Sequence, residues 1–286
     1  MPGRSPLVDT FPVLLLLVLL CTLSACQSSS SKASSPTTNA TTTSSTASDT
    51  TTTSFTAVKV VQRSAQSDQV PVGKSGTVTA TCEQHEQLLS GGYYVYAWEA
   101  AANVVASYPS SKDSWTVTDD NTLGPSSVSI TAYANCLQAP YSVGLRLVSS
   151  TPLATTVDCP SGAVMTGGGF QGTGGIAAST PTSRGWSIMP GGKVFALCAT
   201  ERLRGAPATT AQFTTKMVFG SPQGGSAHCQ DGQIVTGGGY SFAHGVTSIA
   251  INALAQDATS WDIGAAGGYN TVSVVVWAAC VIAPQQ

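Results

Sequence analysis

One pattern of residues recurs three times along this chain and constrains its fold more than any other feature. In each copy a cysteine is followed, eleven residues later, by an aromatic residue that ends a run of glycines. The three sets are Cys82 with Gly91-Gly92-Tyr93, Cys159 with Gly167-Gly168-Gly169-Phe170, and Cys229 with Gly237-Gly238-Gly239-Tyr240. A tryptophan and a second cysteine then follow in the same order: Trp115 and Cys136, Trp186 and Cys198, Trp261 and Cys280. Agreement at so many positions predicts internal repeats, each a single supersecondary unit.

We place the repeats at about 55–140, 141–206 and 213–284. Short alternating runs and frequent turns are typical of β structure. In the second repeat they predict four core strands, which are Ala163–Thr166, Ile176–Ser179, Trp186–Ile188 and Val194–Leu197. Glycine weakens a strand and usually marks a close approach of backbones. Glycine runs at three matching places therefore predict packing near a pseudo-threefold axis, where Cβ atoms would collide.

The fold class expected from these repeats is all-β with pseudo-threefold symmetry. A β-prism is favoured, and a β-trefoil is the second possibility. The segment Cys159-Pro160-Ser161-Gly162, which leads to Gly169-Phe170, resembles the repeats of vitelline membrane outer layer protein I, a three-sheet prism. The resemblance covers a few positions of each unit, and the Cys-Pro pair occurs only in the second. It implies a prism for the whole domain.

The N-terminal segment indicates export. Its apolar run, residues 11–22, is shorter than the roughly 20 residues that a membrane helix needs, and it fits a secretory signal. The following Leu23-Ser24-Ala25-Cys26 resembles the lipobox of bacterial lipoproteins. The resemblance implies cleavage before Cys26 and a diacylglyceryl lipid on its thiol. We therefore expect a signal peptide over 1–25 and an extracytoplasmic protein that is lipid-anchored to the bacterial membrane.

After Cys26 the chain to residue 54 consists almost entirely of Ser, Thr, Ala and Asn. Such a segment has nothing to bury, so residues 26–54 are predicted to be a disordered tether. Residues 55–286 form the predicted β domain. Only 9% of the whole chain is charged and its net charge is −2, which argues against nucleic-acid binding. The expected partners are the membrane, through the lipid, and a glycan or cell-wall polymer, with the domain itself monomeric.

The cysteines fit a disulfide framework. Of eight cysteines, Cys21 lies in the signal and Cys26 carries the lipid, which leaves six, two per repeat. Export favours their oxidation. The repeats favour the pairs Cys82–Cys136, Cys159–Cys198 and Cys229–Cys280, although a swapped set that links neighbouring repeats is also compatible. Metal binding requires close pairs such as Cys-x-x-Cys, and none occurs.

Few residues suit catalysis, and we predict no catalytic residue, metal or cofactor. His85 lies between Glu83 and Glu86, but this cluster occurs in one repeat only and is typical of a solvated loop. His228 and His244 are expected at the surface. Asp119-Asp120-Asn121 has calcium-binding residue types, yet it is also confined to one repeat and fits a polar turn.

The aromatic residues fall into two groups. The recurrent tryptophans Trp115, Trp186 and Trp261 are expected in the core, with an alternative role as platforms for sugar rings. Tyr94, Tyr96, Trp98 and Tyr108 are unique to the first repeat, so they are the first candidates for a ligand site.

Three functions remain compatible with these features. The first is a non-catalytic surface module that binds glycan or cell-envelope polymer. The second is a structural or adhesive surface protein without a small-molecule site. The third is a secreted hydrolase whose acidic residues lie on separate loops.

The cysteine pattern yields a prediction that chemistry can check. In the exported protein, Cys82, Cys136, Cys159, Cys198, Cys229 and Cys280 should all be oxidised. Unfolding without reductant should therefore expose none of them to a thiol reagent, as peptide mass spectrometry would show. Labelling of any of these six sites would contradict the pairing scheme.

Overall fold

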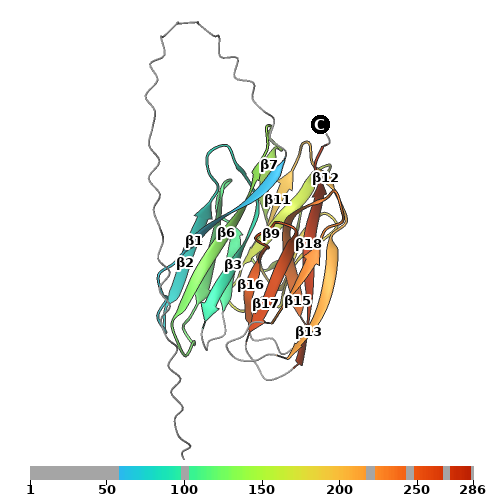
Figure 1. Cartoon of the computed structure of the whole chain (residues 1–286). Helices are drawn as coiled ribbons and strands as arrows, with labels where there is room; N and C mark the ends of the chain where they lie inside the picture. The colour runs from blue at the N-terminus through green and yellow to red at the C-terminus, as the bar shows by residue number, and fades with distance from the viewer. Residues whose placement is uncertain (1–57, 98–102, 217–222, 243–247, 267–270, 285–286) are drawn as a thin grey trace, which may run out of the picture. The chain divides into compact units, whose positions relative to one another are not determined.

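Every regular element that the structure describes is a β-strand. The computed structural model describes residues 58–97, 103–216, 223–242, 248–266 and 271–284. These residues contain eighteen strands (Figure 1), which confirms the predicted all-β class. No helix in these ranges is long and apolar enough to cross a membrane.

The smaller sheet joins strands from distant parts of the chain. Its six antiparallel strands lie in the order β1-β6-β3-β16-β17-β14. Their bounds are Lys59–Gln66, Val128–Gln138, Gln87–Ala97, Ser248–Leu254, Ser260–Ala266 and Gln223–His228. The two halves of the sheet meet where β3 pairs with β16, through Tyr93 and Tyr94 opposite Asn252 and Ile251.

The larger sheet has twelve described strands. Nine lie in the order β12-β18-β15-β10-β11-β9-β4-β5-β2, while β13 pairs with β18, and β7 and β8 both pair with β11. The bounds of the ordered nine are Arg204–Gly205, Thr271–Ile282, Ile234–Phe242, Ala178–Pro181, Gly185–Ala199, Val164–Gln171, Val104–Pro109, Ser114–Asp120 and Ser75–Thr81. Those of β13, β7 and β8 are Thr209–Lys216, Leu145–Ser149 and Ala154–Asp158. Neither sheet closes on itself.

Strand β11 corrects one sequence prediction. The segments 186–188 and 194–197 were expected as separate strands, but they form one strand of 15 residues. Its first half pairs with β8 and β10, and its second half, from Lys193, pairs with β7 and β9. The register shifts between Ser187 and Gly192, around a cis Met189–Pro190 bond. Because hydrogen bonding continues through this irregular segment, two groups of strands count as one long sheet.

Each recurrent tryptophan lies against a glycine of the runs seen in the sequence. Trp115, Trp186 and Trp261 are at most 1% exposed, which confirms the prediction that they are core residues. Any Cβ at Gly91, Gly168 or Gly238 would overlap the ring of Trp115, Trp186 or Trp261, respectively. Each indole N–H is satisfied by a polar side chain, at 3.0, 2.9 and 2.8 Å from Ser107, Ser179 and Asn252. The glycines therefore make room for the largest side chains of the core.

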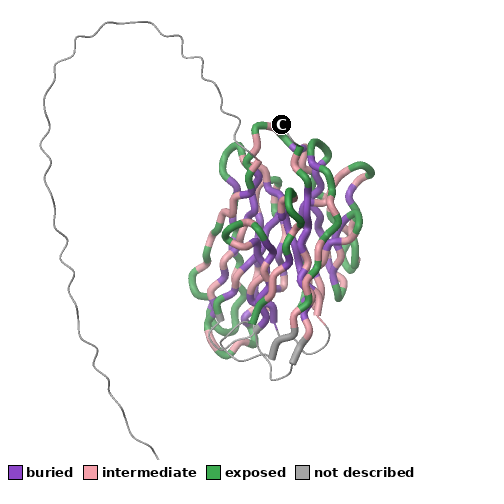
Figure 2. Tube along the Cα trace, turned by 45° about the vertical axis from the view of Figure 1, so that its right-hand side comes forward, coloured by how far each residue is buried: buried purple, intermediate pink, exposed green. Residues whose placement is uncertain are grey.

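The next glycine of each run lets two distant strands approach. A Cβ at Gly92 would meet the carbonyl oxygen of Asn252, and Cβ atoms at Gly169 and Gly239 would meet those of Ser107 and Ser179. These contacts join β3 to β16, β9 to β4, and β15 to β10. Figure 2 shows the outcome, with buried positions along the strands and exposed ones in the connecting turns.

Two glycines of the second predicted repeat give a test of this packing. In Gly168→Ala the new Cβ would overlap the Trp186 ring and lie 2.6 Å from the Phe195 carbonyl oxygen. Overpacking of this kind should lower the free energy of unfolding by about 3 kcal/mol. Gly174→Ala is the matched control, because nothing lies within 4 Å of its Cβ position. Denaturant unfolding would measure both, and equal stability of the two variants would contradict the packing.

Candidate functional site

The six cysteines form three disulfides. The structure joins Cys82 to Cys136, Cys159 to Cys198 and Cys229 to Cys280, with S–S distances of 2.01, 1.99 and 1.94 Å. This is the set within the predicted repeats, not the swapped set. Disulfides persist in oxidising environments, so they point to an extracytoplasmic protein.

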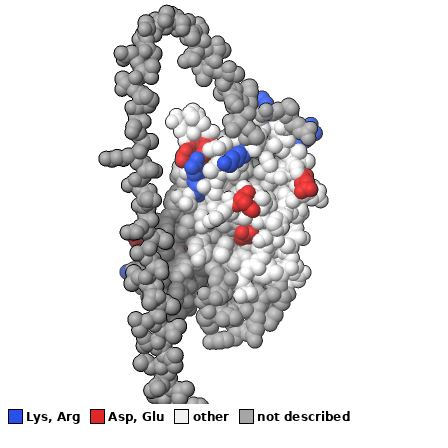
Figure 3. Space-filling model, viewed as in Figure 1, with Lys and Arg blue, Asp and Glu red and all other residues white. Residues whose placement is uncertain are grey.

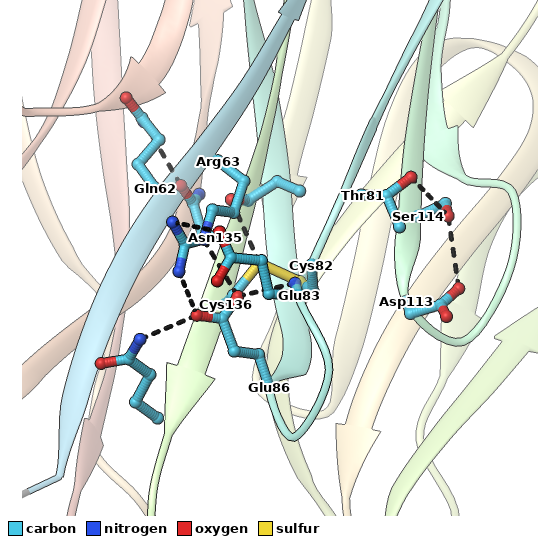
Figure 4. Close-up of a disulfide and its surroundings, with 12 residues drawn as sticks. Gln62, Arg63, Thr81, Cys82, Glu83, Glu86, Asp113, Ser114, Asn135 and Cys136 are labelled. Carbon is cyan, nitrogen blue, oxygen red and sulfur yellow. Dashed lines mark hydrogen bonds and ion pairs between the residues drawn. A yellow bond between two sulfur atoms is a disulfide. The ribbon is translucent and has the colours of Figure 1, made fainter.

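A carboxylate with many partners lies beside the first disulfide (Figure 4). Glu86 accepts hydrogen bonds from Arg63 at 3.1 and 2.5 Å, from the Gln138 amide at 2.8 Å and from the backbone N–H of Glu83 at 2.9 Å. Its side chain is 4% exposed. These bonds, that from Arg63 above all, lower the pKa of Glu86 to about 2. Glu86 therefore stays ionised and ties β1 to the turn that precedes β3.

His85 occupies a position in this turn that glycine fills elsewhere. Its φ of 73° is matched by 81° at Gly162 and 78° at Gly232, three residues after their own cysteines. In all three turns the backbone N–H of the next residue bonds three residues back, as in Glu86 to Glu83. The turn geometry explains the position of His85.

One described group has the residue types of a metal site. The potential ligand atoms of Cys82, Glu86 and Cys136 lie within 4.8 Å of one another. Both sulfurs belong to a disulfide, so they cannot act as thiolate ligands. The carboxylate is already held by Arg63. This group therefore has a structural role.

Asp119-Asp120-Asn121, the turn considered for calcium, forms hydrogen bonds within the domain. The Asp119 carboxylate accepts the backbone N–H of Asn103 at 2.8 Å and is 1% exposed. Burial raises its pKa to about 6. Asp120 accepts a bond from Ser75, and the Asn121 amide donates to the carbonyl oxygens of Val70 and Ser126. The three side chains thus diverge.

Asp119 lies near two buried tyrosines. Tyr93 and Tyr240 are 1% and 2% exposed and hydrogen-bond to each other. Burial raises the pKa of both phenols. The negative charge of Asp119 raises that of Tyr93 further. All three side chains are buried in the core.

The four aromatic residues proposed as a ligand site lie in different places. Tyr94 and Tyr96 belong to β3 in the six-stranded sheet. Tyr108 belongs to β4 in the larger sheet, where its ring stacks on Phe195 with centroids 4.9 Å apart. Trp98 lies outside the described residues. The structure therefore brings Tyr94 and Tyr96 together and assigns Tyr108 to another surface.

Tyr94 and Tyr96 form an aromatic platform on the outer side of their sheet. Their ring centroids are 6.4 Å apart in an edge-to-face arrangement, and Tyr96 is 48% exposed. The residues opposite them on β6 are Thr131 and Ser129, which carry hydroxyls. The platform thus combines flat apolar rings with hydrogen-bonding groups, as a sugar ring requires.

Two hollows lie near the ends of the strands that carry the disulfides. The larger, about 610 Å³, is lined by the turns 160–162 and 182–184, by the segment 205–208 and by Cys280. The smaller, about 280 Å³, lies between residues 59–62 of β1 and the turn 254–258. The amino-acid sequence did not lead us to predict either hollow. The run of small residues Gly205-Ala206-Pro207-Ala208 was the available signal, because it leaves space beside the turns.

Comparison with known proteins assigns neither a family nor a function to this chain. No family model matches the chain, and no curated protein matches it significantly.

The Glu86 cluster predicts a pH dependence of stability. Because the folded pKa lies below the ordinary 4.5, Glu86 stabilises the protein above pH 4.5, and this contribution is lost as the pH falls towards 2. It should amount to on the order of 2 kcal/mol. Unfolding measured from pH 2 to 5 should show a shallower slope for Glu86→Gln than for the wild type. Parallel slopes would contradict the ion pair, and Asp68→Asn is the control at an exposed carboxylate.

Proposed function

We propose that the chain is a lipid-anchored surface protein whose β domain is a three-unit prism that binds a neutral glycan without catalysis. The anchor is supported by Leu23-Ser24-Ala25-Cys26, which resembles a lipobox, and by three disulfides typical of exported proteins. Residues 26–54 then act as the spacer between the lipid and the domain.

The prism is supported by how the described strands group. The six-stranded sheet is one group. The larger sheet divides at β11 into β7-β11-β9-β4-β5-β2 and β13-β18-β15-β10-β11-β8. Each group then combines three strands of one predicted repeat with three strands of another. The glycine contacts between β3 and β16, β9 and β4, and β15 and β10 lie at the three joins.

Glycan binding rests on the platform of Tyr94 and Tyr96. Tyr96 is one of the few large apolar side chains among the described residues that are about half exposed. Ser129 of β6 lies opposite it, and charged side chains are few and scattered on the described surface in Figure 3. An uncharged surface with exposed aromatic rings favours a neutral, hydroxyl-rich ligand over an ionic one.

Tyr96→Ala tests this proposal. The full chain, solubilised in detergent, would be applied to a glycan array and to purified cell-wall polysaccharide. Loss of the exposed ring should weaken binding at least tenfold, about 1.4 kcal/mol. Leu153→Ala is the control, since Leu153 is 85% exposed in the turn before β8, which belongs to the larger sheet.

If Tyr96→Ala weakens the binding of none of the glycans that the wild type binds, the platform is contradicted. Failure of the wild type to bind any glycan would instead favour the structural or adhesive function.

A further inference from the structure

Gln62, Leu147 and Ala208 occupy corresponding positions in the three proposed units, and their side chains differ. The pairing of the strands establishes this correspondence. In each unit an aromatic residue faces a glycine: Tyr133 faces Gly92, Phe195 faces Gly169 and Trp277 faces Gly239. Two residues later come Asn135, Leu197 and Ala279. Gln62 pairs with Asn135, and Leu147 with Leu197. Ala208 precedes Thr209, which pairs with Ala278, so Ala208 is the residue beside Ala279.

In the first of these positions a glutamine side chain bonds to the neighbouring turn. The Gln62 amide donates to the backbone carbonyl of Leu254 at 3.1 Å and to the Asn135 side-chain oxygen at 3.3 Å. Figure 4 shows Gln62 and Asn135 side by side. Leu254 begins the turn that lines the smaller hollow, and Gln62 lines it as well. A side-chain amide of the chain thus reaches across to the neighbouring turn, beside a hollow of about 280 Å³.

In the third position two alanines leave the space open. Ala208 and Ala279 both line the larger hollow of about 610 Å³, which is in the range of small-molecule sites. By register, Pro181 corresponds to Leu254, because Pro181 faces Trp186 as Leu254 faces Trp261. The turn that follows Pro181 forms one wall of this hollow.

The rim of the open hollow carries fixed polar groups. The Thr182 hydroxyl accepts the backbone N–H groups of Gly185 at 2.9 Å and Arg184 at 3.3 Å, which fixes the turn. The Arg184 guanidinium forms an ion pair with Asp158 and is 75% exposed. Cys159 donates its N–H to the Arg184 carbonyl at 2.8 Å, so the disulfide Cys159–Cys198 holds the same turn.

We propose that this hollow binds the acetamido group of an N-acetylated amino sugar. The end of the Gln62 side chain is itself a carboxamide, and it occupies the corresponding space in another unit with its N–H on a backbone carbonyl. A ligand acetamide has the same donor and acceptor, and its methyl group suits the alanine-lined wall. Asp158 and Arg184 at the rim can accept from and donate to sugar hydroxyls. The proposal rests on the three-unit arrangement and adds a site separate from the tyrosine platform.

A pair of matched trisaccharides tests the proposal. The full chain in detergent would be titrated calorimetrically with a β-1,4-linked trimer of N-acetylglucosamine and with the glucose trimer that lacks the acetamido groups. The acetylated trimer should bind one site and the glucose trimer at least tenfold more weakly. Ala208→Gln, at an exposed position, should weaken binding of the acetylated trimer at least tenfold. Leu147→Gln is the matched control, since it adds a glutamine at the corresponding position of the other unit and should leave binding unchanged.

A second variant tests the correspondence directly. Gln62→Ala should open the smaller hollow and raise the number of sites from one to two. Unchanged binding in Ala208→Gln, or a single site in Gln62→Ala, would overturn the proposal. If other glycans bind through Tyr96 while the acetylated trimer does not bind, the proposal for the hollow is contradicted and the proposal for the platform is supported. If Ala208→Gln weakens binding of the trimer while Tyr96→Ala weakens the binding of no glycan, the proposal for the hollow stands and that for the platform is contradicted.

Discussion

The interior of this domain depends on positions that lack a side chain. Gly91, Gly168 and Gly238 lie directly against the rings of Trp115, Trp186 and Trp261, and a Cβ at any of them would overlap an indole. The tryptophans fill the core between sheets, and their N–H groups are satisfied by Ser107, Ser179 and Asn252. Because the next glycines admit strands from elsewhere in the chain, one local feature fixes both the core and the joins between strand groups.

A second set of constraints acts where the disulfides lie. Each disulfide joins the segment before a glycine-bearing strand to the strand that pairs with it. Beside the first disulfide, the ion pair of Arg63 and Glu86 adds a link from β1 to the same turn. The turns beside the larger hollow are held in this way before any ligand arrives, so little ordering would oppose binding there. A rigid rim is what recognition of a small polar group requires.

The acidic residues illustrate why composition alone misleads about function. Glu86 is ionised because four donors surround it, whereas burial raises the pKa of Asp119. Both serve the fold, and their opposite shifts follow from hydrogen bonding in one case and desolvation in the other. The proposed tyrosine platform instead uses uncharged rings, which agrees with a chain of which only 9% is charged.

Sequence alone was sufficient for the features that follow from local pattern. It predicted the all-β class and the burial of the tryptophans, and it favoured the disulfide partners, although only the structure excluded the swapped set. It did not determine that β11 continues through residues 186–197, because hydrogen bonding to β7, β8, β9 and β10 decides this. Only the tertiary structure separated Tyr108 from Tyr94 and Tyr96, and only it placed Ala208 and Gln62 beside their turns. Those arrangements depend on register between strands far apart in the chain, on which local pattern carries no information.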